Sequence, residues 1–323
     1  SHYDKNMSDN FFHQLGLPKP DYNLNCGGGT QAEQTGKIML GYESLIKSDE
    51  KKPDICIVVG DVTSTMACSI VAKKDGIKVA HVEAGLRSRD LSMPEEINRI
   101  VTDSLTDFFF TTSKEASDNL VNEGVSIDKI FFVGNTMIDT LIKNRKKFKK
   151  PSYWNDYKLI QNEYIILTAH RPGNVDDEDS LNLLIETILY NCKNKKVIFP
   201  IHPRTNKNFK IASSFSNLIT IPPAGYFEFM FLLKNSFAVI TDSGGITEEA
   251  TFLNIPCITL RENTERPETV RLGTNVLVGK DNNKIKKYIL KLFDANWKNG
   301  EIPPKWDGKT GSRIVEILLS RDI

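Results

Sequence analysis

Residues 81–99 read HVEAGLRSRDLSMPEEINR: an apolar strand that ends on an acid, a glycine turn, a basic loop, and a helix that opens with two further acids. Residues 54–65, DICIVVGDVTST, have the same form, with Asp61 where the strand should stop. In open parallel sheets, ligands bind beyond the carboxyl ends of the strands, so acids placed there by successive strand–helix units converge. Asp61, Glu83 and Glu95 are therefore candidate acid and base groups.

Strands and helices alternate along the chain from residue 54, which predicts parallel α/β structure. In the first half we expect strands near 55–59, 78–82, 108–111 and 130–133, and helices near 64–74, 95–105, 114–122 and 136–146. In the second half we expect strands near 164–168, 196–201, 217–221, 237–241, 256–260 and 275–278, and helices near 179–191, 226–234, 246–253 and 284–293. A short helix at 9–15 and a helix from about Thr30, with Thr30 and Glu33 in a capping box, precede these elements.

A polar, lysine-rich segment at 143–157 interrupts the alternation and is typical of an interdomain linker. We therefore predict an α/β fold with two Rossmann-like domains facing each other across a cleft. The first comprises residues 1–150 and carries the acids, and the second comprises residues 151–323. The last helix, near 311–320, could pack back on the first domain.

The composition is that of an ordinary globular protein, with 40% hydrophobic and 26% charged residues. Because 42 Lys and Arg balance 41 Asp and Glu, nothing global favours nucleic acid or an anionic membrane as a partner. Five scattered cysteines without CxxC spacing indicate free thiols in a reducing cytoplasm, and no residue pattern indicates a metal. The first residues lack a basic segment followed by an apolar core, so we expect no signal peptide.

Two of the acids also have structural interpretations. Asp61 could be the N-cap of the helix that follows it. Glu83 lies at a strand end, where an acid is rarely buried unless it is paired, and Arg87 is the nearest candidate partner.

Glu95 likewise has a structural interpretation. Ser92 and Glu95 fit a capping box, and Glu95 and Arg99 fit a helical i,i+4 ion pair. A capping role is compatible with chemistry, because we expect an apolar buried face to leave Glu95 near the strand ends. That expected face consists of Ile97, Ile100, Val101 and Leu105.

Two histidines occupy equivalent positions in the second half. His170 and His202 follow the apolar strands EYIILTA and KVIFPI, and each has a basic residue nearby, Arg171 in the first case. A lone histidine is usually structural, but two at equivalent strand ends indicate contacts to an anionic ligand.

The turn at 242–245, Asp-Ser-Gly-Gly, lies between the strand FAVIT and the helix ITEEATFL. Glycines let backbone amides approach an anion, and a helix N-terminus adds a favourable field, so a diphosphate fits here. The alternative is a tight turn in which Ser243 is an N-cap while Glu248 and Glu249 complement the helix dipole. Phe229 has the helical spacing of a core residue.

At these residues the chain resembles the non-hydrolysing UDP-N-acetylglucosamine 2-epimerases, whose fold is the two-Rossmann arrangement of the GT-B glycosyltransferases. The resemblance covers essentially the whole chain and rests on several motifs in the family's order. They are GDVTSTMA, HVEAGLR, MPEEINR, VGNTMIDTL, LTAHR, TDSGGITEEA and TERPETVRLGT.

The resemblance implies roles for individual residues. The family's catalytic acids fall on Asp61, Glu83 and Glu95, and its active-site histidine falls on His170. The UDP contacts fall on Ser243, Gly244, Gly245 and Glu249, the last at the ribose hydroxyls, with Phe229 near the uracil and Arg266 near the diphosphate. Arg87, Arg171 and His202 complete the predicted substrate-binding residues.

The implied reaction is elimination of UDP to a 2-acetamidoglucal, followed by re-addition of UDP and proton delivery to the opposite face. It requires no cofactor and no metal, and the resemblance further implies a homodimer. The alternatives are a GT-B glycosyltransferase, a hydrolysing epimerase and a non-catalytic UDP-sugar binding protein.

The sequence differs from the family pattern in two places, and each difference leads to an expectation about this chain. Members begin with a strand and an Arg-Pro-Glu-like turn that this sequence does not contain, so we expect the first domain to lack that strand. HYDKNMSD (2–9) and RPGN (171–174) differ from the segments of members that their own substrate activates. We therefore expect no such activation, and a modified UDP-2-acetamido sugar is an alternative substrate.

Overall fold

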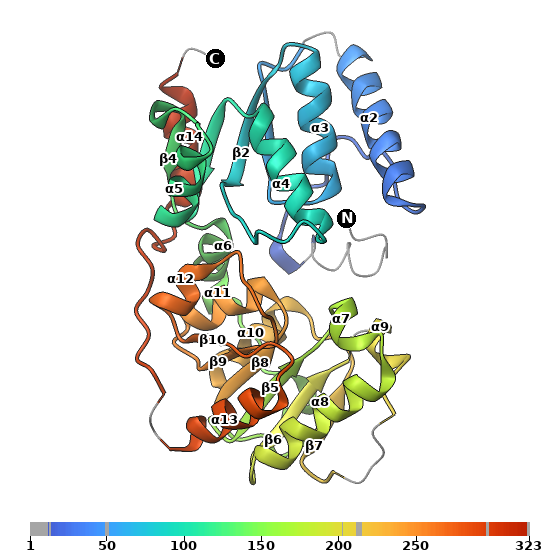
Figure 1. The fold of residues 1–323 in the computed structure, drawn as a ribbon, viewed down its shortest axis with the longest axis vertical. Coiled ribbons are helices and arrows are strands. Elements are labelled where there is room, and N and C mark those ends of the chain that lie inside the picture. The colour runs from blue at the N-terminus through green and yellow to red at the C-terminus, as the bar shows by residue number, and fades with distance from the viewer. Residues whose placement is uncertain are drawn as a thin grey trace. The chain divides into compact units, whose positions relative to one another are not determined.

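The protein, in a computed structural model, is described over residues 12, 14–48, 52–201, 203–210, 215–294 and 297–321. The chain forms two compact units (Figure 1), unit 1 from residues 1–139 with 304–323 and unit 2 from residues 140–303. The first boundary thus falls after Asp139, within helix α6 (Thr136–Asn144), whereas the sequence suggested a boundary near 150. The helix expected at 9–15 lies mostly outside the described residues.

Unit 1 contains a parallel sheet with the strand order β1-β2-β3-β4. Its strands are β1 (Ile55–Val59), β2 (Lys78–Ala84), β3 (Phe108–Thr111) and β4 (Ile130–Phe132). Its helices are α2 (Gln31–Ser48), α3 (Thr63–Lys74), α4 (Pro94–Leu105), α5 (Lys114–Asn122), η1 (Ile127–Lys129), the first part of α6, and α14 (Thr310–Leu319). The predicted capping box of α2 is confirmed, because the Thr30 amide donates to Glu33 at 2.7 Å and the Glu33 amide donates to Thr30 Oγ1 at 3.2 Å.

The last helix, α14, packs within unit 1. Its Ile314 lies in the apolar cluster that Ala80, Val82, Phe110 and Val133 form on the sheet. The Gly311 amide also donates to Asp139 Oδ2 at 2.9 Å. The chain therefore leaves unit 1 once and returns to it at its end.

Unit 2 contains a six-stranded parallel sheet with the order β10-β9-β8-β5-β6-β7. Its strands are β5 (Tyr164–Thr168), β6 (Lys196–Pro200), β7 (Leu218–Ile221), β8 (Ala238–Thr241), β9 (Cys257–Thr259) and β10 (Asn275–Leu277). Its helices are η2 (Arg145–Lys147), η3 (Ser152–Trp154), α7 (Pro172–Val175), α8 (Glu178–Asn191), α9 (Pro203–Asn206), α10 (Tyr226–Asn235), α11 (Gly244–Phe252), α12 (Pro267–Arg271) and α13 (Asn282–Phe293). This is the Rossmann order, in which the direction of winding reverses between β5 and β8.

Both faces of the unit 2 sheet are covered by helices, which explains why its strands are continuously apolar. Alternate strand residues such as Ile165 and Val197 pack with α8 and α13, which lie side by side in Figure 1. The intervening residues, such as Ile166 and Val239, pack with α10 and α11.

The predicted α/β class is confirmed, and the described strands begin and end within about two residues of their predicted positions. Among the helices that the structure describes, none is both long and apolar enough to cross a bilayer.

Candidate active site

Asp61 follows β1 at a glycine turn. Gly60 has φ +69°, and its amide donates to the Val82 carbonyl at 3.0 Å, which ends the β1–β2 ladder. The Asp61 carboxylate lies 2.5 Å from the Arg99 guanidinium. The N-cap interpretation of Asp61 is wrong, because the N-cap of α3 is Val62 and no side chain caps that helix. Asp61 is instead held toward α4.

Glu83 sits in a bulge at the end of β2. The register of β2 against β3 shifts between Val82 and Ala84, and Glu83 has φ +74°, an uncommon conformation for a residue with a side chain. Non-glycine residues in this conformation concentrate at functional sites. The Thr136 hydroxyl donates to its carboxylate at 3.4 Å, and a Cβ built on Gly60 would lie 4.0 Å from Glu83 Oε2. The bulge thus turns Glu83 toward the Asp61 turn.

Arg87 pairs with two acids other than Glu83, the partner suggested by the sequence. Its guanidinium lies 2.7 Å from the Asp103 carboxylate and 2.5 Å from the Glu123 carboxylate. Arg87 is buried among these contacts. Its predicted role in binding substrate stays a prediction.

The orientation predicted for helix α4 is wrong. Ile97 and Ile100 are 47% and 40% exposed, and the buried face is polar. That face consists of Glu96, Asn98, Arg99, Thr102 and Asp103. The predicted capping box is also wrong, because the N-cap is Met93 and the Ser92 hydroxyl donates to Asp90.

The two glutamates that open α4 have different environments. Glu96 is buried and accepts the backbone amides of Ser88 and Arg89 at 2.9 and 2.7 Å. Burial raises the pKa of Glu96, but these amides and Arg99 outweigh it, so its pKa lies below the ordinary value. Glu95 is exposed.

Glu95 lies one helical turn before the two residues that hold Asp61. Asn98 Nδ2 donates to the Asp61 carbonyl at 2.8 Å, and Arg99 pairs with the Asp61 carboxylate rather than with Glu95 as the sequence suggested. Residues three and four apart share one helix face, so Glu95 lies on the α4 face that is directed at the Asp61 turn. Unit 1 therefore places Glu83 close to the turn that carries Asp61, and places Glu95 one helical turn before the residues that hold Asp61.

In unit 2, His170 follows β5 and lies against a buried aspartate. His170 Nδ1 is 2.7 Å from Asp242 Oδ1, while Asp242 Oδ2 accepts the amides of His170 and Arg171, both at 2.9 Å. Asn174 Nδ2 adds a hydrogen bond to the same oxygen at 3.0 Å. Burial raises the pKa of Asp242, but the contact with His170 and these donors outweigh it and hold the pKa below its ordinary value. Asp242 thus orients both the His170 ring and its loop.

The N-terminus of α11 follows β8, directly beside β5. Ser243 is the N-cap, as the structural interpretation proposed, but its side chain makes no capping hydrogen bond. Gly244 and Gly245 form the first turn, so small residues flank the backbone amides that a helix N-terminus leaves without an intrahelical partner. This turn and His170 both lie at the point where the sheet reverses its winding, which is the usual ligand position in such sheets.

Glu249 is buried one turn further along α11. Burial raises its pKa to about 8, against a smaller lowering effect of the Tyr226 hydroxyl, which donates to it. Phe229, on α10, packs against the apolar cluster of α10 and α11, in agreement with its helical spacing. Its predicted position near a uracil stays a prediction.

Arg266 is buried at the start of α12 and lies 3.1 Å from the Glu248 carboxylate. Next to it, Arg261 and Glu265 pair at 2.6 Å, and a Cβ on Gly244 would lie 2.9 Å from Glu265 Oε1. The predicted anion-binding turn therefore lies beside a paired cluster that includes two arginines. His202 and the segment 2–9 lie outside the described residues.

Comparison with known proteins identifies the family. The family model described as UDP-N-acetylglucosamine 2-epimerase matches residues 1–319. The chain belongs to the UDP-N-acetylglucosamine 2-epimerase family. This confirms the resemblance drawn from the motifs and makes the chain an isomerase by family.

Members of this family are similar to the chain over nearly its whole length. A UDP-N-acetylglucosamine 2-epimerase of Methanocaldococcus jannaschii is 45% identical, with 98% of this chain and 88% of the relative covered. The crystal structure of that organism's enzyme, in complex with UDP-GlcNAc and UDP, has a TM-score of 0.88 at 44% identity and covers 99% of this chain and 90% of its own. A UDP-2,3-diacetamido-2,3-dideoxy-D-glucuronate 2-epimerase of Pseudomonas aeruginosa is 40% identical, with 98% and 88% covered. The GT-B fold class is thereby confirmed.

Sequence reasoning missed several residues of the epimerase chain that hold the predicted ones in place. The sequence suggests that Arg99 pairs with Glu95. Arg99 instead pairs with Asp61, 38 residues away in the chain, and no local sequence pattern indicates such a contact. Asp242 directly follows β8, and an acid directly after an apolar strand is the sequence signal that also marks Asp61. Asn174, in the RPGN segment, is buried and donates a hydrogen bond to Asp242.

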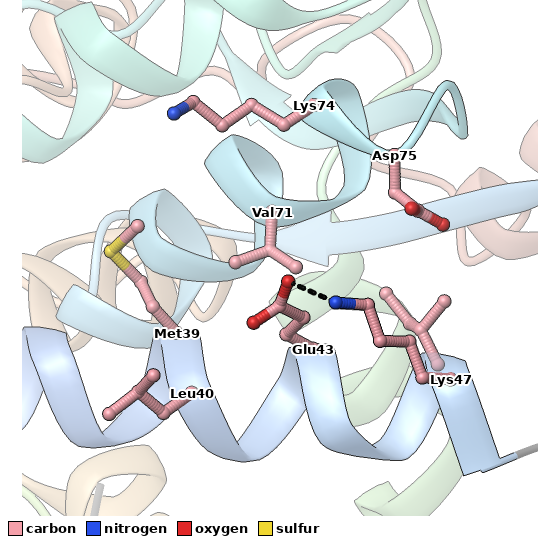
Figure 2. A pocket seen from close by; sticks show the side chains of 8 residues that line it. Met39, Leu40, Glu43, Lys47, Val71, Lys74 and Asp75 are labelled. Carbon is pink, nitrogen blue, oxygen red and sulfur yellow. Dashed lines mark hydrogen bonds and ion pairs between the residues drawn. The ribbon is translucent and has the colours of Figure 1, made fainter.

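A hollow of about 300 Å³ between α2 and α3 lies apart from these residues (Figure 2). Met39, Leu40 and Val71 line it, and the ion pair of Glu43 and Lys47, at 2.7 Å, lies at its edge. It adjoins the C-terminal end of α3, whereas Asp61 precedes the first residue of that helix. The hollow is therefore not part of the candidate active site.

Proposed function

We propose that this protein interconverts UDP-N-acetylglucosamine and UDP-N-acetylmannosamine, or a closely related pair of UDP-2-acetamido sugars, without hydrolysis. The observation that supports the proposal is that Glu83 lies close to the turn carrying Asp61, at the ends of β1 and β2, while Glu95 precedes the α4 residues that hold Asp61. Carboxylates at such positions can act as general bases and, when protonated, as general acids. They suit a reaction that moves a proton off and onto carbon.

The chemistry is elimination followed by re-addition. A carboxylate removes the proton from sugar C2 while the bond between C1 and the diphosphate oxygen breaks, giving a 2-acetamidoglucal and UDP. UDP then re-adds at C1, and a carboxylic acid delivers a proton to the opposite face of C2. Asp61, Glu83 and Glu95 supply the base and the acid.

Unit 1 carries the catalytic acids, and unit 2 holds UDP. Because the C2 proton is not acidic, departure of a stabilised diphosphate must lead. The α11 N-terminus with Ser243, Gly244 and Gly245, together with Arg266, Arg171 and His202, contacts the diphosphate, and His170, fixed by Asp242, assists its departure. Glu249 contacts the ribose hydroxyls, Phe229 lies near the uracil, and Arg87 supports the substrate through the loop after β2. The protein acts as a homodimer in the cytoplasm.

Product analysis tests the proposal. The protein is incubated separately with UDP-N-acetylglucosamine and with UDP-2,3-diacetamido-2,3-dideoxy-D-glucuronate, the sugar nucleotide named for the Pseudomonas relative. The proposal expects the C2 epimer of at least one of them, still attached to UDP, and the same mixture from either side. Release of free N-acetylmannosamine would favour a hydrolysing epimerase. Transfer to an added acceptor, or UDP binding without any product, would contradict the proposal.

A further inference from the structure

His81 is completely buried in the middle of β2 and has a partner on each side of its ring. Nδ1 lies 2.7 Å from Asp103 Oδ1 on α4, and Nε2 lies 2.9 Å from the Gly60 carbonyl at the end of β1. Both distances are those of hydrogen bonds. The ring therefore links helix α4 to the turn that presents Asp61.

The chemistry of the two partners fixes the protonation of the ring. A carbonyl oxygen can only accept, so Nε2 carries a proton. Asp103 Oδ2 faces the Arg87 guanidinium at 2.7 Å and accepts the Gly85 amide at 3.1 Å, so Asp103 is a carboxylate that also only accepts. Nδ1 therefore carries a proton as well. Since a neutral imidazole has a single N–H, only a doubly protonated ring donates to both of these acceptors.

A buried imidazolium requires charge compensation, and its neighbours supply it. Asp103 Oδ2 faces the Arg87 guanidinium at 2.7 Å, and Arg87 continues to Glu123, whose side chain is 43% exposed. The two cations and two anions thus form an ion-pair network that runs from the sheet to the surface. Its members are His81, Arg87, Asp103 and Glu123. The charges cancel along it.

The same ion-pair network makes a hydrogen bond to each of the two turns that present Asp61 and Glu83. The Gly60 carbonyl directly precedes Asp61, and Asp103 Oδ2 accepts the Gly85 amide at 3.1 Å, two residues after Glu83. Glu83 has φ +74°, which is costly for a residue with a side chain, so the turn that presents Glu83 holds a conformation that needs support from outside.

We propose that His81 is a positioning residue, an imidazolium that fixes the turns presenting Asp61 and Glu83. It does not touch the substrate and acts through Gly60 and Asp103. Its kinetic consequence rests on the proposed epimerase function, whereas its protonation and its effect on the two turns do not.

The protonation is tested by NMR of the wild-type protein with ¹⁵N-labelled histidine at pH 8, where an exposed histidine is largely neutral. The His81→Gln spectrum assigns the signal. We expect both ring nitrogens of His81 to carry protons, and we expect the neutral pattern in Asp103→Asn, which removes the negative partner. One protonated and one unprotonated nitrogen in the wild-type ring would overturn the proposal.

The positioning role is tested with His81→Gln, which keeps a donor on one side only. We expect a kcat lower by about tenfold or more with KM changed less than about twofold, because misplaced acids affect the chemical step. The control is Ser69→Ala, which removes a buried hydrogen bond to Thr65 within α3 and should leave kcat intact. A folded His81→Gln protein with wild-type kcat, or with unchanged Asp61 and Glu83 turns in its crystal structure, would contradict the role.

The two arms separate the possible failures. If the wild-type protein shows no epimerase activity, the proposed function fails, while the NMR spectrum and the structure of His81→Gln still decide the assignment of His81.

Discussion

Glu249 is a buried acid that the fold keeps protonated near neutral pH. Its pKa of about 8 arises mainly from burial, since its partner Tyr226 is a neutral hydroxyl rather than a cation. The neighbouring Glu248 is equally buried but lies 3.1 Å from the Arg266 guanidinium. Two adjacent glutamates thus have opposite electrostatic environments.

This difference predicts a pH-dependent effect of Glu249→Gln on stability. Between the ordinary pKa of 4.5 and the folded value of about 8, the folded protein retains a proton that the unfolded chain releases. The free energy of unfolding therefore falls as the pH rises through that window. Glutamine removes this loss, so the Tm of the variant should exceed the wild-type Tm by several °C at pH 8 and differ little at pH 5.

Glu248→Gln is the matched control, and it should lower the Tm at both pH values because it breaks a pair with Arg266. Equal Tm differences between Glu249→Gln and the wild type at pH 5 and pH 8 would contradict the assignment of a neutral Glu249. Thermal unfolding followed by circular dichroism measures both variants.

At the residue scale, the sequence predicted the acids better than their partners. Asp61 follows β1 and Glu83 lies at the end of β2, and a position at a strand end is visible in a single sequence. Arg99, Asp103 and His81 act across elements, and only the folded chain shows whom they meet. The helical spacing of Phe229 predicted an apolar environment, and Phe229 is partly buried against an apolar cluster.

Among the elements, β2 and the turn after it carry the geometry of the site. The bulge at Glu83 is followed by Gly85, where a Cβ would lie 2.2 Å from the Ala116 carbonyl oxygen on α5. Gly85 also has φ +76°, which disfavours any side chain. Glycine therefore allows α5 to approach the turn that presents Glu83.

Gly85→Ala should be strongly destabilising, and Gly76→Ala supplies a matched control. Gly76 has a similar φ of +73°, but a Cβ there would meet nothing within 4 Å. We expect Gly76→Ala to cost about 1–2 kcal/mol through its backbone conformation alone, and Gly85→Ala to cost roughly 1–3 kcal/mol more through overpacking. Urea unfolding measures both. Equal losses would contradict a close approach at Gly85.

Helix α4 shows where periodicity misleads. Counting apolar residues predicted that Ile97 and Ile100 face the core, yet the buried face carries Glu96, Arg99 and Asp103. The helix lies over strand ends and a loop, whose amides at Ser88, Arg89 and Gly85 require acceptors. The need to satisfy buried polar groups outweighed the burial of two isoleucines.

For the whole molecule, the alternation of strands and helices predicted both sheets, because hydrophobic period and length are local properties. The Rossmann order of unit 2, with β5 in the centre, depends on long-range strand pairing, which the alternation does not specify. The return of α14 to unit 1 is a long-range contact, between Ile314 and residues such as Val133, and composition alone does not specify it.

The proposed homodimer predicts a mass in solution of twice the chain's 36.5 kDa. Analytical ultracentrifugation measures it directly. A single species of 36.5 kDa at micromolar concentration would contradict the dimer.

The central claim, that carboxylates at the strand ends exchange the C2 proton, is tested by incubating the protein with UDP-N-acetylglucosamine in deuterated water and following C2 by proton NMR. The account predicts deuterium at C2 of both epimers, with rates at least about a hundredfold lower in Asp61→Asn, Glu83→Gln and Glu95→Gln and unchanged in Glu43→Gln, at the edge of the distant hollow. Epimer formation with the original hydrogen retained at C2, or wild-type exchange in all three acid variants, would contradict it.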